Sequence, residues 1–168
     1  FGEIWSARLL VSLLAQKNSQ DPLMREVHEL NARKIIHVFH GEMGPIVDWS
    51  KSQLGLEKEK NKYTGILVMG GFLATDLDTN PTTLGRNGSD FSASIIASLT
   101  DAESVTIWTD VDGVMTGNPN QVSGVKIIHQ MSYDEAAELA YFGAQVIHPK
   151  MMSPLIKKKY SNLYQKYF

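Results

Sequence analysis

The fold is decided by residues 66–90, ILVMGGFLATDLDTNPTTLGRNGSD, where an apolar run ends in two glycines and leads into a polar loop. The four apolar residues at 66–69 are typical of a buried parallel strand, which is hydrophobic on both faces. After the loop we expect Ser89 or Asp90 to cap a helix, because a side-chain oxygen there accepts an otherwise orphaned backbone N–H. The stretch therefore predicts a strand, a loop and a helix in succession.

Upstream of this stretch, hydrophobic spacing and turn residues divide the chain into short elements. The predicted elements are helices over residues 3–16 and 23–34, a strand over 35–39, and a helix or solvated loop over 50–62.

Downstream, a second apolar strand is predicted over residues 105–109. Ser132 and Glu135 have the spacing of a capping box, which predicts a helix that should end at Gly143. Pro149 is expected to open a last helix at its first position. Strands that alternate with helices predict an α/β fold, a three-layer sandwich with a largely parallel sheet. Ligands of such sheets bind beyond the carboxyl ends of the strands. Two loops of this chain, residues 70–90 and 110–120, are predicted to leave strands at that edge.

Composition excludes several classes of function. The 168 residues carry a formal charge of −2, which gives no electrostatic reason to expect a nucleic acid or membrane partner. With no cysteine, the chain has neither disulfides nor thiolate chemistry, and a reducing, cytoplasmic compartment fits that absence. No apolar run reaches the roughly 18 residues of a membrane span. The five histidines form no metal-binding pair, so we expect no metal site made by the protein alone.

The segment around Arg86 has two readings. The guanidinium suits a carboxylate or phosphate, and Ser89 with the following helix start adds N–H donors and partial positive charge. The alternative is a glycine-rich turn with a helix cap and a surface arginine. The loop that begins Thr109-Asp110 is equally open: its carboxylates can accept ribose hydroxyls or hold a metal-bound water, or simply cap a turn. The chain contains neither a P-loop nor a Gly-x-Gly-x-x-Gly dinucleotide motif.

A family resemblance emerges from these segments together. Residues 65–156 resemble aspartate kinase, of the amino-acid kinase superfamily, and most of all the kinase portion of bifunctional aspartate kinase–homoserine dehydrogenases. The segments that carry the likeness are Gly71-Phe72-Leu73-Ala74, Pro81 to Asp90, Ile107 to Val114, Met131 to Ala144, His148-Pro149 and, at the start, Gly2 to Ala7. The resemblance implies the carbamate kinase-like α/β fold, with residues 1–168 as part of a catalytic domain.

The resemblance also implies roles for individual residues. Arg86 is expected to bind a carboxylate of L-aspartate, Glu3 to face its ammonium group and Ser89 to help hold the substrate, while Asp90 organises the catalytic centre. The nucleotide side would comprise Thr109, Asp110, Asn120 and Gln145. The implied reaction is phosphoryl transfer from Mg-ATP to the β-carboxylate, with Mg²⁺ carried by the nucleotide, as the first step towards lysine, threonine and methionine. Such a transfer depends on positioning and charge stabilisation.

The chain departs from the family pattern at several places. The family's Lys-Phe-Gly-Gly segment, its ACT regulatory regions and its dehydrogenase portion are absent from these 168 residues, so we expect an incomplete domain that is inactive alone. Asn120 and Gln145 stand where the family usually has a phosphate-binding arginine and lysine.

Two alternative functions remain: a catalytically silent ligand-binding module of the same fold, or another kinase acting on glutamate, acetylglutamate or UMP. The full-length protein is expected to be a homo-oligomer, in the cytoplasm or, in a plant, the plastid.

Overall fold

The computed structural model describes residues 1–18, 25–42, 44–109, 113–142 and 148–157 of the chain. The chain divides into two compact units, residues 1–93 and 94–168, with the boundary inside helix α4 (Gly88–Thr100). No helix in the described ranges is both long and apolar enough to cross a membrane. Each unit is considered separately below.

The first unit contains all the strands that the described residues form. They pair as three two-stranded sheets: β1 with β4 in parallel, β2 with β3 and β5 with β6 antiparallel. An isolated parallel bridge also joins His37 to Thr75. The elements before α4 are α1 (Gly2–Asn18), β1 (Val27–Leu30), α2 (Ala32–Ile35), β2 (Val38–Gly41), β3 (Gly44–Val47), α3 (Trp49–Lys60), β4 (Ile66–Met69), β5 (Leu73–Thr75) and β6 (Pro81–Thr83).

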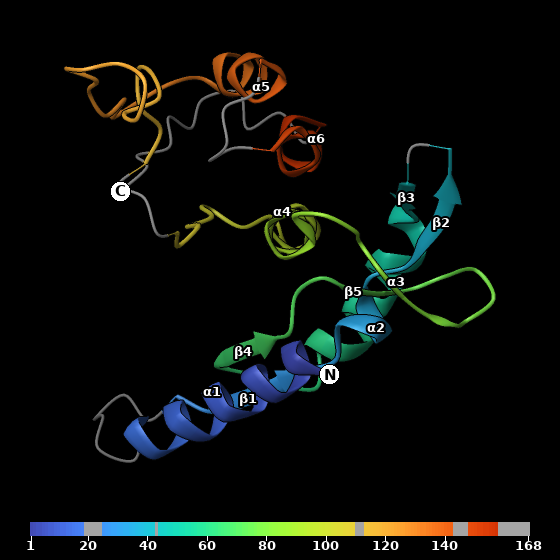
Figure 1. Ribbon diagram of the computed structural model, residues 1–168. Helices are drawn as coiled ribbons and strands as arrows, with labels where there is room; N and C mark the ends of the chain where they lie inside the picture. Colours follow the sequence, from blue (N-terminus) through green and yellow to red (C-terminus); the bar gives the residue numbers. More distant parts are fainter. Residues whose placement is uncertain (19–24, 43, 110–112, 143–147, 158–168) are drawn as a thin grey trace. The chain divides into compact units, whose positions relative to one another are not determined.

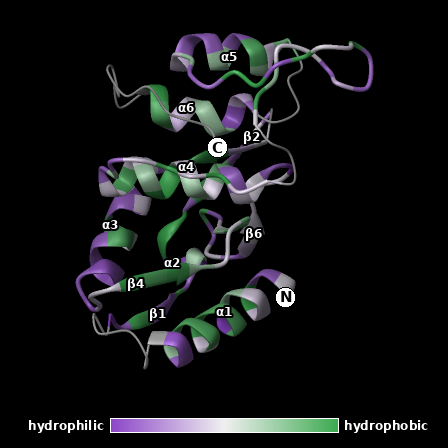
Figure 2. Cartoon of the chain, turned by 90° about the vertical axis from the view of Figure 1, so that its left-hand side faces the viewer, coloured by the Kyte–Doolittle hydropathy of each residue, from purple (hydrophilic) through white to green (hydrophobic). Residues whose placement is uncertain are grey.

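Helix α1 runs beside the parallel β1–β4 pair, and Figure 1 shows the three elements together. Strand β4 is hydrophobic along its length, as Figure 2 shows. The predicted helix over 3–16 and the predicted strand over 66–69 are both confirmed. On α1, Ala7 is buried, while the larger apolar side chains of Trp5 and Leu9 are exposed.

The helix predicted over residues 23–34 is wrong over residues 27–30, while residues 32–34 are helical and belong to α2. Residues 27–30 form strand β1 instead, because they pair in register with residues 66–69, a partner that helical periodicity does not reveal. The helix α2 that follows has only four residues, and Asn31 caps it by accepting the Arg33 N–H. The strand predicted over 35–39 begins three residues later, at Val38, since Ile35 still belongs to α2.

The second unit is built around the end of α4 and two further helices, α5 (Tyr133–Tyr141) and α6 (Pro149–Lys157). The predicted capping box and the predicted Pro149 start are both confirmed. Residues 105–109 form no strand, although they are described, and Trp108 is 93% exposed. The predicted stop at Gly143 lies outside the described residues. The core of this unit comprises Val114, Met131, Ala136, Ala140, Met151 and Met152.

Candidate functional site

Strand β4 ends in Gly70 and Gly71, and other backbone lies against both glycines. A β carbon on Gly70 would lie 2.8 Å from the Glu3 carbonyl oxygen at the start of α1. One on Gly71 would lie 3.1 Å from the Ser89 Cα in the first turn of α4. A β carbon at position 70 would therefore force the start of α1 to shift, and one at position 71 would make an unusually tight contact. The glycine pair brings Glu3 and Ser89, two of the predicted substrate-binding residues, to the same strand end.

The next residue, Phe72, is held in an unusual backbone conformation. Its φ of 70° lies in the left-handed region, where a bulky side chain is rare and strained. Its N–H donates to the Ser92 hydroxyl oxygen at 2.9 Å, and its carbonyl accepts the Leu84 N–H at 2.9 Å. Both peptide groups of Phe72 are thus fixed by the segment that carries Arg86, Ser89 and Asp90. The Phe72 ring also lies against Gly88, whose β carbon would come within 2.7 Å of it.

Arg86 lies at the tip of the turn between β6 and α4. Leu84 anchors this turn in the core with no exposed surface. Gly85 and Asn87 on either side of the arginine have positive φ values, 76° and 57°, so the chain reverses sharply and leaves the Arg86 side chain exposed. An exposed guanidinium on a turn fixed at its base is well placed to bind an anion in its planar fork of donors.

Helix α4 begins at Gly88, two or three residues earlier than a cap at Ser89 or Asp90 would place its start. Ser89 and Asp90 therefore lie inside the first turn, and the expectation that one of them caps the helix is wrong. The Asn87 carbonyl accepts the Phe91 N–H at 3.1 Å, which shows that the helical hydrogen bonding starts at Asn87. Ser89 is exposed and Asp90 half-buried at this end of the helix, where backbone N–H groups give a partial positive charge.

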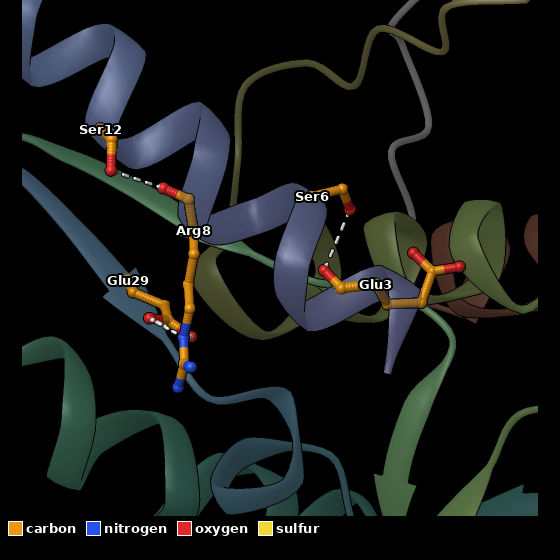
Figure 3. A network of polar contacts seen from close by, with 5 residues as sticks. All are labelled: Glu3, Ser6, Arg8, Ser12 and Glu29. Atoms are coloured by element: carbon orange, nitrogen blue, oxygen red, sulfur yellow. Dashed lines mark hydrogen bonds and ion pairs between the residues drawn. The ribbon is translucent and has the colours of Figure 1, made fainter.

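Glu3 stands in the first turn of α1, partly buried. Its carbonyl accepts the Ser6 hydroxyl at 3.1 Å, while its carboxylate points away from the Arg8–Glu29 ion pair, as Figure 3 shows. Arg8 binds Glu29 at 3.1 Å and so ties α1 to β1 on the other side of the helix. The Glu3 carboxylate is a negative group at the strand end to which Gly70 brings it.

The predicted nucleotide residues belong to the second unit or lie outside the described residues. Thr109 and Asn120 are both exposed there, whereas Asp110 and Gln145 are not described. The Asn120 N–H donates to the Asn118 side-chain oxygen at 2.9 Å, so the Asn118-Pro119-Asn120 sequence forms a closed turn. An antiparallel bridge between Met115 and Ile127 closes the loop that holds this turn. The structure groups the substrate residues in one unit and leaves the nucleotide assignments as predictions.

Two carboxyl groups elsewhere in the chain have lowered pKa values. A hydrogen bond from Lys62 at 2.7 Å, followed by the charge of Lys34, lowers the pKa of Glu59 although burial opposes it. Hydrogen bonds from the backbone and hydroxyl of Ser132 lower the pKa of Glu135. Both sets of contacts stabilise helix ends, at α3 and α5 respectively. In the described ranges no three His, Asp or Glu residues gather as metal ligands, and the expectation of no protein-only metal site stays a prediction.

Sequence reasoning missed two features of this strand end. The first is the close backbone approach at Gly70 and Gly71, for which the glycine pair directly after an apolar run was the available signal. The second is Ser92, which is buried on α4 and bonded to Phe72. A serine inside an apolar helix gives no sign of its distant partner.

Comparison with known proteins places the chain among kinases. The sequence model described as "Amino acid kinase family" matches residues 1–161. The chain is 36% identical over 94% of its length to a bifunctional aspartokinase/homoserine dehydrogenase of Buchnera aphidicola, and 40% identical over 93% to a chloroplastic one of Zea mays. It spans only 19% and 16% of those two proteins.

A solved structure shows the same likeness in three dimensions. The structure of E. coli aspartokinase III in complex with aspartate and ADP, in the R-state, superposes with a TM-score of 0.81 at 31% identity. The match covers 93% of this chain and 34% of the E. coli chain. This likeness confirms the predicted fold, an α/β amino-acid kinase fold of which the chain forms a part.

Proposed function

The chain belongs to the amino acid kinase family, and from that premise we propose that the protein carrying it phosphorylates the β-carboxylate of L-aspartate with ATP. Relatives named aspartokinases, and a neighbour solved with aspartate and ADP, support this reaction. The observation that carries the proposal is the strand end where Gly70 and Gly71 bring together Glu3 and Ser89. A carboxylate, a hydroxyl and the nearby turn of Arg86 match the ammonium and carboxylate groups of an amino acid.

On the substrate side, charge decides the orientation of the amino acid. The Arg86 guanidinium would bind one carboxylate through two parallel hydrogen bonds, and Glu3 would face the ammonium group. Ser89 and the backbone N–H groups of the first turn of α4 would hold the carboxylate further. Asp90, in the same turn, would organise the catalytic centre beside these groups. Holding the reacting groups in this way supplies much of the acceleration in a transfer of this kind.

In the reaction, an oxygen of the β-carboxylate attacks the γ-phosphorus of ATP. The bond between that phosphorus and the β,γ-bridging oxygen breaks, so ADP leaves and an acyl phosphate, 4-phospho-L-aspartate, forms. The nucleotide would be contacted by Thr109, Asp110, Asn120 and Gln145, and its Mg²⁺ would offset the phosphate charge.

The wider role would be the first step towards lysine, threonine and methionine. The protein would work as a homo-oligomer in the cytoplasm, or in the plastid of a plant.

The test is an ADP-release assay on the intact protein with Mg-ATP and L-aspartate. Hydroxylamine added to the same mixture should trap the acyl phosphate as a hydroxamate, which separates transfer to aspartate from hydrolysis of ATP. We expect ADP and hydroxamate in equal amounts, both dependent on aspartate. ADP formed without aspartate, or no ADP at all, would contradict the proposal. Glutamate, acetylglutamate and UMP tested in parallel would identify a kinase of another specificity.

A catalytically silent binding module is the second candidate. Asn120 and Gln145 favour it, because neither side chain carries the positive charge that a nucleotide phosphate attracts. Calorimetry separates the two candidates. A silent module would bind L-aspartate through Arg86 and give no heat with Mg-ATP, whereas a kinase would bind both ligands.

A further inference from the structure

The hydroxyl group of Ser92 joins two parts of the strand end described above. Ser92 lies on α4 with 1% of its surface exposed. Its hydroxyl donates to the Gly88 carbonyl at 2.8 Å and accepts the Phe72 N–H at 2.9 Å. A serine hydroxyl has one donor and two acceptor sites, so it makes both bonds at once.

Phe72 needs such a partner because of its conformation. At a φ of 70° its backbone is strained, and only surrounding contacts keep it there. The second contact is the bond from the Leu84 N–H to the Phe72 carbonyl at 2.9 Å. Leu84 stands at the start of the turn that carries Arg86, and Ser92 stands just after Ser89 and Asp90. The two hydrogen bonds of Phe72 therefore fix both ends of the Leu84–Ser92 segment to the end of β4.

We propose that Ser92 is a positioning residue, whose hydroxyl holds Phe72 in the left-handed conformation and so fixes the Leu84–Ser92 segment against the end of β4. Ser92 is not expected to touch the substrate; it acts through Phe72 and the first turn of α4. The identity of the ligand that this geometry serves, L-aspartate, rests on the proposed function. The positioning itself does not depend on it, because it concerns hydrogen bonds within the protein.

Without the hydroxyl, the part-buried Phe72 N–H would lose its partner. Because leaving such a donor unpaired costs free energy, Phe72 is expected to relax towards negative φ and the segment to become mobile. Affinity for the amino acid should fall, because Arg86 and Ser89 would no longer be held in place. Affinity for ATP should stay unchanged, because the predicted nucleotide residues lie on other loops.

The experiment compares Ser92→Ala with the wild type in the intact protein. Amide hydrogen exchange at Phe72 and over residues 84–90 should accelerate about tenfold. The KM for L-aspartate should rise about tenfold, while the KM for ATP stays within about twofold. Ser98→Ala is the matched control, since Ser98 is also buried on α4 but lies roughly 9 Å further along the helix. It should leave exchange at Phe72 unchanged.

Ser92→Thr tests the hydroxyl itself. A threonine hydroxyl in a helix bonds the carbonyl four residues earlier, so this variant should restore slow exchange and the low KM for aspartate. A Thr variant as impaired as the Ala variant, or an Ala variant with wild-type exchange, would overturn the inference. Failure of the proposed function looks different: the wild type would release no ADP with aspartate, yet Ser92→Ala would still accelerate exchange at Phe72.

Discussion

Residues 70–92 and residues 113–135 are both loop regions that follow predicted strands, but they are held by different kinds of contact. In the first, the contacts join distant parts of the chain: Gly70 meets Glu3, and Gly71 meets Ser89. In the second, the hydrogen bonds are local or join the two sides of one loop, although Val114 and Met131 also belong to the hydrophobic core of the second unit. The Thr116 N–H donates to the Lys126 carbonyl, and Ser132 caps its own helix through Glu135.

The difference bears on what each region can do. A segment fixed by backbone contacts from several elements holds side chains in one geometry, as substrate binding requires. Hydrogen bonds within one loop fix its local shape but do not align its side chains with those of other elements. We therefore expect changes in residues 70–92 to alter recognition of the amino acid, and changes in residues 113–135 to alter local stability.

The largest effect is expected from Arg86→Ala. Loss of the bidentate, charge-assisted hydrogen bonds between the guanidinium and the carboxylate should weaken aspartate binding about 100-fold. The affinity for ATP should change by less than about threefold, because in the proposed site the guanidinium serves the carboxylate alone. Calorimetry with each ligand separately measures both effects. The result would assign binding of the substrate carboxylate to residues 70–92.

Two further arginine variants control this measurement. Arg86→Lys keeps the charge without the planar fork and should give an intermediate affinity for aspartate. Arg8→Ala removes another exposed arginine of the same unit, one that pairs with Glu29, and should leave the affinity for both ligands unchanged. Equal losses for aspartate and ATP in Arg86→Ala would show that this turn is assigned to the wrong ligand.

The second prediction concerns the glycines that make the first region compact. In Gly70→Ala the new methyl group would lie 2.8 Å from the Glu3 carbonyl oxygen, so the start of α1 must move. We expect a loss of about 1–3 kcal/mol in the free energy of unfolding, measured by chemical denaturation. The KM for aspartate should rise as well, because Glu3 moves with the helix.

Two glycines serve as controls. A methyl group on Gly2 has no atom within 4 Å, and one on Gly117 lies at an ordinary 3.4 Å from Val125. Alanine at either position should change stability by less than about 0.5 kcal/mol. If Gly117→Ala in the second region were as costly as Gly70→Ala, the contrast between a tightly fixed region and a locally closed one would fail.

The same contrast explains what the sequence could predict. The capping box of Ser132 and the Pro149 helix start depend on residues a few positions apart, and both are confirmed. Strand β1 was mistaken for a helix because its identity comes from pairing with β4, far along the chain. The strand predicted over 105–109 is absent because an apolar run alone does not guarantee a partner strand.

In the candidate site, too, features set by neighbouring residues were predictable and features set by distant partners were not. Its residue types, Arg86, Ser89 and Asp90, were predictable from the chemistry of one short segment. That Ser89 and Glu3 meet at the same strand end was implied only by the family resemblance, because it depends on how α1 packs against the end of β4. Ser92 was not predictable at all, since its partner Phe72 is separated from it by a strand pair and two turns.

The smallest expected effect is the pH dependence of the capping box in the second region. Hydrogen bonds from Ser132 lower the pKa of Glu135, so the folded state binds this proton more weakly than the unfolded chain. The stabilisation is therefore complete above the ordinary glutamate pKa of about 4.3 and is lost as the pH falls through the lower folded value. Ser132→Ala should cost about 1 kcal/mol near neutral pH. Denaturation curves at neutral pH and near pH 3 should show that this cost shrinks in acid without vanishing, because the Ser132 hydroxyl also accepts the Glu135 N–H at either pH.

The control is Glu138→Gln, which lies on the same helix but outside the capping box. In a Glu138→Gln background, the cost of Ser132→Ala should change with pH in the same way. A cost that stayed constant with pH would mean that the Glu135 carboxylate takes no part in holding the start of α5.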